Sequence, residues 1–345
     1  MDHVDWKPDI LGSDYSQSVL DLGTDPDEEG TVEAVLVRRE PSTGEATPAP
    51  ERGAVLYVHG FTDYFFQREL ADFFAARGLR FYALDLRKCG RARKPGQTAH
   101  YVSDLALYDK ELDRALEIVT AAHPGAPVIL AAHSTGGLIV PLWLNRRRLA
   151  GTAHPAASVA AVVLNSPWLD LQGDKVLRGP VTQLLRVLSK VRPFLVIKVR
   201  PGPYGRTLHV TGTGEWDYDL ELKPLAGFPV TVGWMNAIRR AQAREHRGIE
   251  TGVPTLVLRS TESRPSAEAS DRADIVIDTA HIAQWAPRLG RQVTDVPVKD
   301  ARHDVFLSLP EIRASAYAAL ANWLDRHPLP QPADDRKGSP KQSIE

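Results

Sequence analysis

Short apolar runs alternate along the chain with segments in which apolar residues recur at helical spacing. Many of these runs are continuously apolar, which is typical of strands buried on both faces of a parallel sheet. We expect strands at Thr31–Val37, Ala54–Val58, Arg80–Leu84, Val128–Ala132, Val159–Leu164, Thr255–Leu258 and Gln292–Val298. We expect helices at Tyr64–Ala76, Asp104–Ala122, Gly136–Arg148, Trp234–Arg247, Thr279–Leu289 and Pro310–Asp325. The alternation predicts an α/β protein with a mostly parallel, twisted sheet and helices on both faces.

Three segments interrupt this alternation. Residues 40–52 are rich in Pro, Gly, Ser and Thr and predict a turn between early strands. The segment Pro167–Val232 holds prolines, glycines and one amphipathic stretch at Val181–Val191, but no strand–helix unit. The end of the chain is rich in Pro, Lys and Asp, as disordered tails are. The predicted organisation is a core of residues 1–166 and 233–328, an inserted cap of residues 167–232 and a disordered tail of residues 329–345.

Composition and charge narrow the class of protein further. The chain has 345 residues, 43% of them hydrophobic, and a formal net charge of −1, so it offers no electrostatic reason to bind nucleic acid or an anionic membrane. Its single cysteine, Cys89, excludes an internal disulfide framework and suits a reducing compartment. The start of the chain is too polar for a secretory signal, and no run approaches the roughly 20 apolar residues of a membrane span. We therefore expect a cytoplasmic protein, whose oligomeric state the sequence leaves open.

One serine lies between a strand-like run and two adjacent glycines, in the stretch AAHSTGGL from Ala131 to Leu138. A strand that ends at Ala132 and a helix that starts at Gly136 leave Ser134 on a tight, strained reversal. This places the hydroxyl above the carboxyl edge of the sheet, where open parallel sheets bind ligands. The pattern A-x-S-x-G lacks the first glycine of the nucleophile elbow G-x-S-x-G, and the added methyl predicts a slightly wider turn. Ser134 is a candidate nucleophile, with helix capping as the structural alternative.

The stretch YVHGFTDY, residues 57–64, follows another buried strand and supplies candidate hydrogen-bond donors. Its His-Gly pair turns the backbone, so that the amide of Phe61 could point towards Ser134. The amide of Thr135 begins the helix after the serine. Two such amides form an oxyanion hole, which stabilises the negative charge that develops in the transition state of acyl transfer.

Of the 11 histidines, His303 is the best placed to act as a base. It follows the last expected strand, in VPVKDARHDVFLSLP, and a loop there returns to the sheet edge that carries Ser134. A base must come within about 3 Å of the serine hydroxyl, whereas His133, next to the serine, is expected to point away from it. The carboxylate that orients the base should follow the strand that ends at Leu258. Position leaves four candidates there: Glu262, Asp271, Asp274 and Asp278.

The order serine, acid, histidine resembles the α/β-hydrolase superfamily, and more narrowly its serine-aminopeptidase/monoacylglycerol-lipase-like branch. The resemblance covers roughly Val32 to Arg326 and includes DLRKCGRA, from Asp85, in place of the branch's D-x-R-G-x-G-x-S. In this branch the acid heads a D-x-V-V or D-x-L-C-D run, which the stretch DIVID, starting at Asp274, matches. The resemblance therefore implies Asp274 as the acid, with Glu262 or Asp278 as alternatives. It also implies a cap inserted where the Pro-rich segment lies.

The resemblance implies acyl transfer by Ser134 and His303, with neither a metal nor an organic cofactor. Aromatic residues in or beside the cap predict an apolar acyl pocket. The candidates for lining it are Tyr64, Phe65, Trp168 and Trp234. We expect a carboxylesterase or monoacylglycerol-lipase type enzyme that acts on small hydrophobic esters, with no nucleic-acid partner. Aminopeptidase, thioesterase and lactonase activities use the same machinery, and a non-catalytic binding member of the fold is the remaining alternative.

Overall fold

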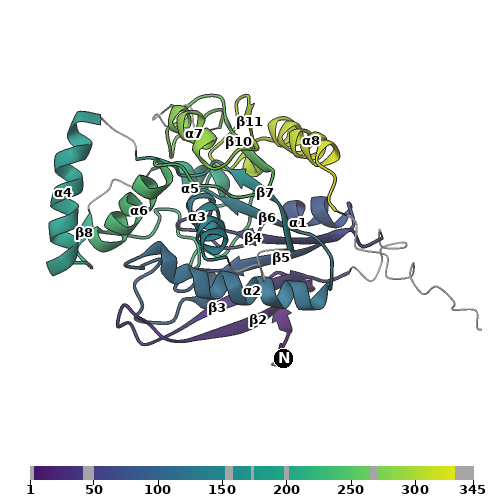
Figure 1. The fold of residues 1–345 in the computed structure, drawn as a ribbon, viewed down its shortest axis with the longest axis horizontal. Helices are drawn as coiled ribbons and strands as arrows, with labels where there is room; N and C mark the ends of the chain where they lie inside the picture. Colours follow the sequence, from purple (N-terminus) through teal and green to yellow (C-terminus); the bar gives the residue numbers. More distant parts are fainter. Residues whose placement is uncertain are drawn as a thin grey trace, which may run out of the picture.

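A computed structural model of the chain describes residues 4–41, 50–151, 158–171, 175–197, 202–264 and 271–330, without the side chains of 175–182. Within these residues nine strands form one sheet, in the order β1-β2-β3-β5-β4-β6-β7-β10-β11 (Figure 1). The strands from β5 to β11 in this order are parallel, and β1 to β3 form an antiparallel edge. The strands are β1 (Lys7–Asp9), β2 (Gly12–Thr24), β3 (Thr31–Arg39), β4 (Gly53–Val58), β5 (Leu79–Asp85), β6 (Val128–His133), β7 (Val159–Asn165), β10 (Thr255–Ser260) and β11 (Val293–Val298). The predicted fold class is confirmed.

Alternate side chains of the strands belong to two hydrophobic cores, one on each face of the sheet. Leu56 and Val58 of β4 belong to the core under α2 and α3, whereas Val55 and Tyr57 belong to the core under α1 and α8. All four are buried, which explains why the strand is apolar at every position. The helices are α1 (Arg68–Ala75), α2 (Asp109–Ala122), α3 (Gly136–Leu149), α4 (Lys175–Val191), α5 (Tyr204–Leu208), α6 (Val232–Glu245), α7 (Thr279–Trp285) and α8 (Pro310–Arg326).

Of the three strands in the antiparallel edge, the hydrophobic pattern predicted β3 but neither β1 nor β2. β2 alternates buried and exposed residues and buries Ser16 and Ser18, so it lacks the apolar run of the other strands. The helix expected from Tyr64 begins at Arg68 instead, because the residues before it make tertiary hydrogen bonds, such as Phe65 N–H to Asp85 Oδ1 at 3.1 Å. The other expected strands and helices are present, with small shifts of their ends and 3₁₀ turns at two of them.

Between β7 and α6 the chain leaves the sheet, where the insertion is predicted. α4, α5 and a small antiparallel pair, β8 (Val196–Ile197) with β9 (Val230–Thr231), lie in this segment, and α4 stands at the edge of the molecule (Figure 1). The amphipathic stretch expected from Val181 belongs to α4. Residues 42–49 of the expected turn and 331–345 of the expected tail lie outside the described residues. In the part of the chain that the structure describes, no helix could cross a membrane.

Candidate active site

Ser134 lies on a sharp bend between β6 and α3. Its φ of 51° is in the left-handed region, which a non-glycine residue rarely adopts. Two backbone hydrogen bonds hold the bend: Ser134 N–H donates to Asn165 O at 2.9 Å, and Trp168 N–H donates to Ser134 O at 3.0 Å. The strained turn therefore forms with Ala132, a buried residue, in the place of the elbow glycine.

His303 connects the serine to a buried carboxylate. Its Nε2 lies 3.0 Å from Ser134 Oγ, and its Nδ1 lies 2.9 Å from Asp274 Oδ2. Asp274 is fully buried, and its Oδ1 accepts hydrogen bonds from the backbone N–H groups of Val276 at 2.8 Å and Ile277 at 2.9 Å. A carboxylate held in this way accepts a hydrogen bond from Nδ1–H, which leaves Nε2 free to accept a hydrogen bond from the serine hydroxyl.

Asp274 reaches the histidine because the chain folds back beside the end of β10. Asp274 N–H donates to Glu262 O at 2.9 Å, so the last residues of the loop that follows β10 lie beside the end of this strand. The other candidate carboxylates have different partners: Glu262 is exposed and pairs with Arg264, Asp271 pairs with Arg302, and Asp278 caps the start of α7. Only Asp274 of these four carboxylates, all of them described, is hydrogen-bonded to His303.

The amides of Phe61 and Thr135 are both available to donate hydrogen bonds. Within the described residues, neither N–H has an acceptor. Thr135 follows the serine directly. Phe61 follows Gly60, and Gly60 lies against the serine, because a Cβ added to Gly60 would be 3.0 Å from Ser134 Cβ. An oxyanion hole needs unpartnered amides close to the nucleophile, and these two residues lie next to the serine or to a residue that packs against it.

A cavity of about 1110 Å³ lies beside Ser134 and His303. Its wall is mostly apolar and includes Trp168 and Trp234, both predicted to line a pocket. The Phe61 ring packs against Trp234 with ring centroids 4.3 Å apart, and the Trp168 ring follows at 5.8 Å from Trp234. Among the described residues no carboxylate lines this cavity, and no group of three or more His, Cys, Asp or Glu is arranged to hold a metal.

Tyr64 and Phe65 do not line the cavity, which corrects the prediction for both residues. Phe65 is fully buried in the core under α1 and α8, with its ring 5.0 Å from that of Phe81. Tyr64 belongs to the same core, and its hydroxyl accepts a hydrogen bond from Asp219 N–H at 2.8 Å. Consecutive side chains leave a loop in different directions, so Phe61 reaches the cavity while its aromatic neighbours face the core.

His133 and Tyr204 lie at the site, although the sequence analysis proposed neither. The His133 ring is 4.9 Å from the His303 ring and lines the cavity, while its Nδ1 contacts Asp63 and not the serine hydroxyl. The Tyr204 hydroxyl accepts a hydrogen bond from Asp304 N–H at 2.9 Å, and its ring is 5.8 Å from that of His303. Tyr204 comes from the insertion, where no sequence spacing relates it to the serine.

The order of the parallel strands, the serine on its strained bend and the loop that carries the histidine define an α/β-hydrolase. The sequence matches the family described as serine aminopeptidase, S33, over residues 49–305, and the chain belongs to this hydrolase family. The match begins before β4 and ends just after His303, so it includes the core strands, the insertion and the candidate site. A comparison of the sequence with curated proteins gave no match.

Solved structures of the same fold include two lipases and an esterase. A soluble variant of the monoglyceride lipase from Saccharomyces cerevisiae is 14% identical, with a TM-score of 0.60 over 95% of this chain and 96% of that one. The monoacylglycerol lipase of Paleococcus ferrophilus is 21% identical, with a TM-score of 0.58 over 81% and 97%. A thermostable carboxyl esterase from Bacillus coagulans is 13% identical, with a TM-score of 0.59 over 90% and 98%. At these identities the likeness establishes the fold.

Proposed function

We propose that this protein is a serine hydrolase that cleaves hydrophobic carboxylic esters through an acyl-enzyme on Ser134. The observation that carries the proposal is the hydrogen-bonded series Ser134–His303–Asp274 at the wall of an apolar cavity. A buried imidazole between a hydroxyl and a carboxylate is the arrangement that activates a serine for nucleophilic attack.

The proposed reaction assigns a step to each part of the site. Ser134 attacks the ester carbonyl while His303 accepts its proton, and Asp274 orients the imidazole and stabilises its charged form. The amides of Phe61 and Thr135 stabilise the tetrahedral oxyanion. His303 then protonates the leaving alcohol, and a water molecule, activated by the same imidazole, releases the acyl group.

The cavity wall favours a neutral ester over a peptide with a free amino terminus. An ammonium group that moves into an apolar cavity needs a compensating charge, and no described carboxylate lines this one. The lining residue Lys223 is paired with Asp63, so this pair offers an ammonium group no free negative charge. The monoglyceride lipase and the carboxyl esterase among the structures of the same fold act on esters by their names, which agrees with this choice.

The nucleophile is tested with a fluorophosphonate probe followed by peptide mapping. The probe should label Ser134 in the wild-type protein, and Ser134→Ala should lose both the label and at least ~10⁴-fold in kcat for a nitrophenyl ester. Ser189→Ala, a variant of a serine on α4, is the control and should behave as wild type. A folded wild-type protein that takes no label would contradict the proposal and favour a binding role.

The substrate class is tested with nitrophenyl esters of increasing acyl length and with aminoacyl-anilides. Because the wall is apolar, kcat/KM should rise with acyl length until the cavity is filled, by roughly threefold or more per added methylene at first. Hydrolysis of aminoacyl-anilides without hydrolysis of esters would replace the proposed activity by that of an aminopeptidase.

A further inference from the structure

The loop that carries Phe61 is attached to the last part of the insertion. We call residues 59–66 the oxyanion loop and residues 216–228 the return segment. Three successive residues of the loop each hold the return segment by a hydrogen bond or ion pair: Phe228 N–H to Thr62 Oγ1 at 2.9 Å, Lys223 Nζ to Asp63 Oδ1 at 2.5 Å, and Asp219 N–H to Tyr64 Oη at 2.8 Å. The rings of Phe66 and Tyr218 add an apolar contact at 4.8 Å.

The Lys223–Asp63 ion pair is buried at this junction. The side chains are 9% and 2% exposed, respectively, and Asp63 also contacts His133 Nδ1 at 3.2 Å. Burial alone would raise the pKa of Asp63, but the ammonium of Lys223 and the hydrogen bond with His133 lower it well below its usual value. Asp63 is therefore an ionised carboxylate inside the protein, and Lys223 supplies its compensating charge.

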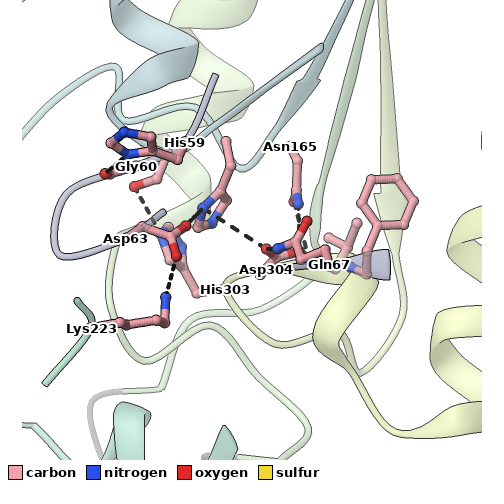
Figure 2. A network of polar contacts seen from close by, with 12 residues as sticks. His59, Gly60, Asp63, Gln67, Asn165, Lys223, His303 and Asp304 are labelled. Atoms are coloured by element: carbon pink, nitrogen blue, oxygen red, sulfur yellow. Dashed lines mark hydrogen bonds and ion pairs between the residues drawn. The ribbon is translucent and has the colours of Figure 1, made fainter. Parts of the chain in front are cut away.

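Further polar contacts link the ion pair to the loops that carry the proposed catalytic residues. His133, which precedes the nucleophile, lies 3.9 Å from Asp304 Oδ2, and Asp304 follows His303 directly. Asp304 in turn accepts hydrogen bonds from Asn165 Nδ2 at 2.6 Å and from Gln67 Nε2. Figure 2 shows this buried polar network, with Lys223 at one end and Asn165 and Gln67 at the other.

The oxyanion loop has a backbone conformation that must be held in place. Thr62 has a φ of 50°, in the left-handed region, which is unfavourable for a β-branched residue. Its neighbours on both sides are fixed, Gly60 by its close approach to Ser134 and Asp63 by the ion pair. A loop of this kind would relax towards another conformation if its attachment were lost.

We propose that Lys223 and Asp63 form a positioning pair, through which the insertion holds the oxyanion loop in the conformation that presents the Phe61 amide to the substrate. The inference rests on the proposed function, because it assigns the pair a part in the same reaction. Neither residue reacts with the substrate. Their effect reaches the transition state through the position of one amide, so their loss should lower kcat more than it raises KM.

The four variants Lys223→Met, Asp63→Asn, their double variant and Lys223→Arg separate positioning from charge balance. Each neutralising single variant leaves one buried charge without its partner, and it should lower Tm by roughly 5–15 °C. The double variant removes both charges, so most of the decrease in Tm should be absent and its Tm should lie near that of the wild type. If the pair positions the loop, the double variant keeps a kcat about 10–100-fold below wild type, with KM changed less than threefold. Lys223→Arg keeps the charge and should recover part of kcat.

Lys190→Met is the matched control, because it removes an exposed lysine of the same insertion. It should leave Tm, kcat and KM unchanged. The inference is overturned if the double variant regains wild-type kcat together with its Tm, which would make the pair purely structural. It is also overturned if folded Lys223→Met has a kcat within twofold of wild type. If the single variants do not fold, the double variant and Lys223→Arg provide the same comparison.

Hydrogen exchange followed by mass spectrometry distinguishes this inference from the proposed function. Amides of residues 59–66 should exchange at least tenfold faster in Lys223→Met than in Lys190→Met, whether or not an ester is hydrolysed. Faster exchange in a protein that cleaves no ester would retain the attachment of the loop and reject the proposed function. Unchanged exchange would reject the part of the Lys223–Asp63 pair in holding the loop.

Discussion

At the scale of single residues, the role of the carboxylate that contacts His303 can be tested by substitution. Asp274→Asn keeps the shape of the side chain and the Oδ1 acceptor for Val276 and Ile277, but it removes the charge that stabilises the imidazolium. We predict that kcat for a nitrophenyl ester falls by ~10³–10⁴-fold while KM changes little. Steady-state kinetics on the folded variant, verified by circular dichroism, measures this.

The two alternative acids provide the controls for that prediction. Glu262→Gln and Asp278→Asn should keep kcat within twofold of wild type, because the Glu262 side chain is exposed and the Asp278 side chain caps α7. A loss in Asp278→Asn as large as in Asp274→Asn would show that the active form has a different acid. The order of residues in DIVID could not exclude Asp278, because only the folded loop shows which carboxylate returns to β10.

At the residue scale, sequence patterns were informative where backbone geometry demands particular residues. A serine on a strained bend and a histidine in the loop after the last strand follow from strand ends that the apolar runs already mark. The directions of neighbouring side chains do not follow in this way. Their aromatic character and closeness to Phe61 predict Tyr64 and Phe65 at the cavity, yet both are buried in the opposite core.

At the scale of elements, the contact between α3 and β4 depends on one glycine. A Cβ on Gly136 would lie 2.6 Å from the carbonyl oxygens of Val58 and His59, a distance at which the helix and strand must move apart. We predict that Gly136→Ala lowers the free energy of unfolding by about 1–3 kcal/mol or more. Chemical denaturation measures this free energy. We also expect kcat to fall, because the bend that carries Ser134 would shift with the helix.

Gly202→Ala is the control for this prediction, because a Cβ there meets nothing within 4 Å. Its free energy of unfolding should stay within about 0.5 kcal/mol of wild type. An equal loss of stability in the two variants would mean that the effect comes from the backbone and not from the helix–strand contact.

The sequence predicted the elements that are apolar throughout and missed the one that is not. β4 and β6 are buried on both faces, so every position contributes to their pattern. β2 is the longest strand, but it lies towards the edge of the sheet and mixes serines with apolar residues. Its position depends on pairing with β3 along nine residue pairs, which local periodicity does not encode.

At the scale of the whole molecule, Glu245 at the end of α6 makes stability depend on pH. Its side chain is buried, and neither carboxylate oxygen has a hydrogen-bond partner among the described residues. Burial, with a smaller effect of Asp170, raises the pKa of Glu245 from 4.5 to about 8. The folded protein therefore binds this proton more tightly than the unfolded chain, so the stability that it contributes is complete below pH 4.5 and is lost towards pH 8.

Glu245→Gln removes this titration while keeping the shape of the neutral side chain. Between pH 5 and 8 the free energy of unfolding of the wild type should fall by a few kcal/mol relative to that of the variant, because a shift of one pKa unit corresponds to about 1.4 kcal/mol. Urea unfolding across this range measures the difference, and Glu117→Gln, a half-exposed residue on α2, should show no such change. A wild-type curve parallel to that of Glu245→Gln would contradict the prediction.

The attachment of the insertion is the feature of the whole molecule that the sequence revealed least. Apolar patterning located the segment, but Lys223 and Asp63 are 160 residues apart and neither belongs to a periodic pattern. Such pairs arise from the path of the chain in three dimensions. Lys223 of the insertion contacts Asp63 (Figure 2), and both side chains are buried, so the insertion supplies a charge to the protein interior and not only a cover for the cavity.

This arrangement limits how the insertion can be exchanged between members of the family. A chimera that receives a foreign segment in the place of residues 167–232 keeps Asp63 but loses the lysine that neutralises it. The grafted protein would then carry an unmatched acid next to His133, even if every core residue were native. A successful transplant must bring the tract FTDYFF from the donor as well, so that the two stretches are inherited together.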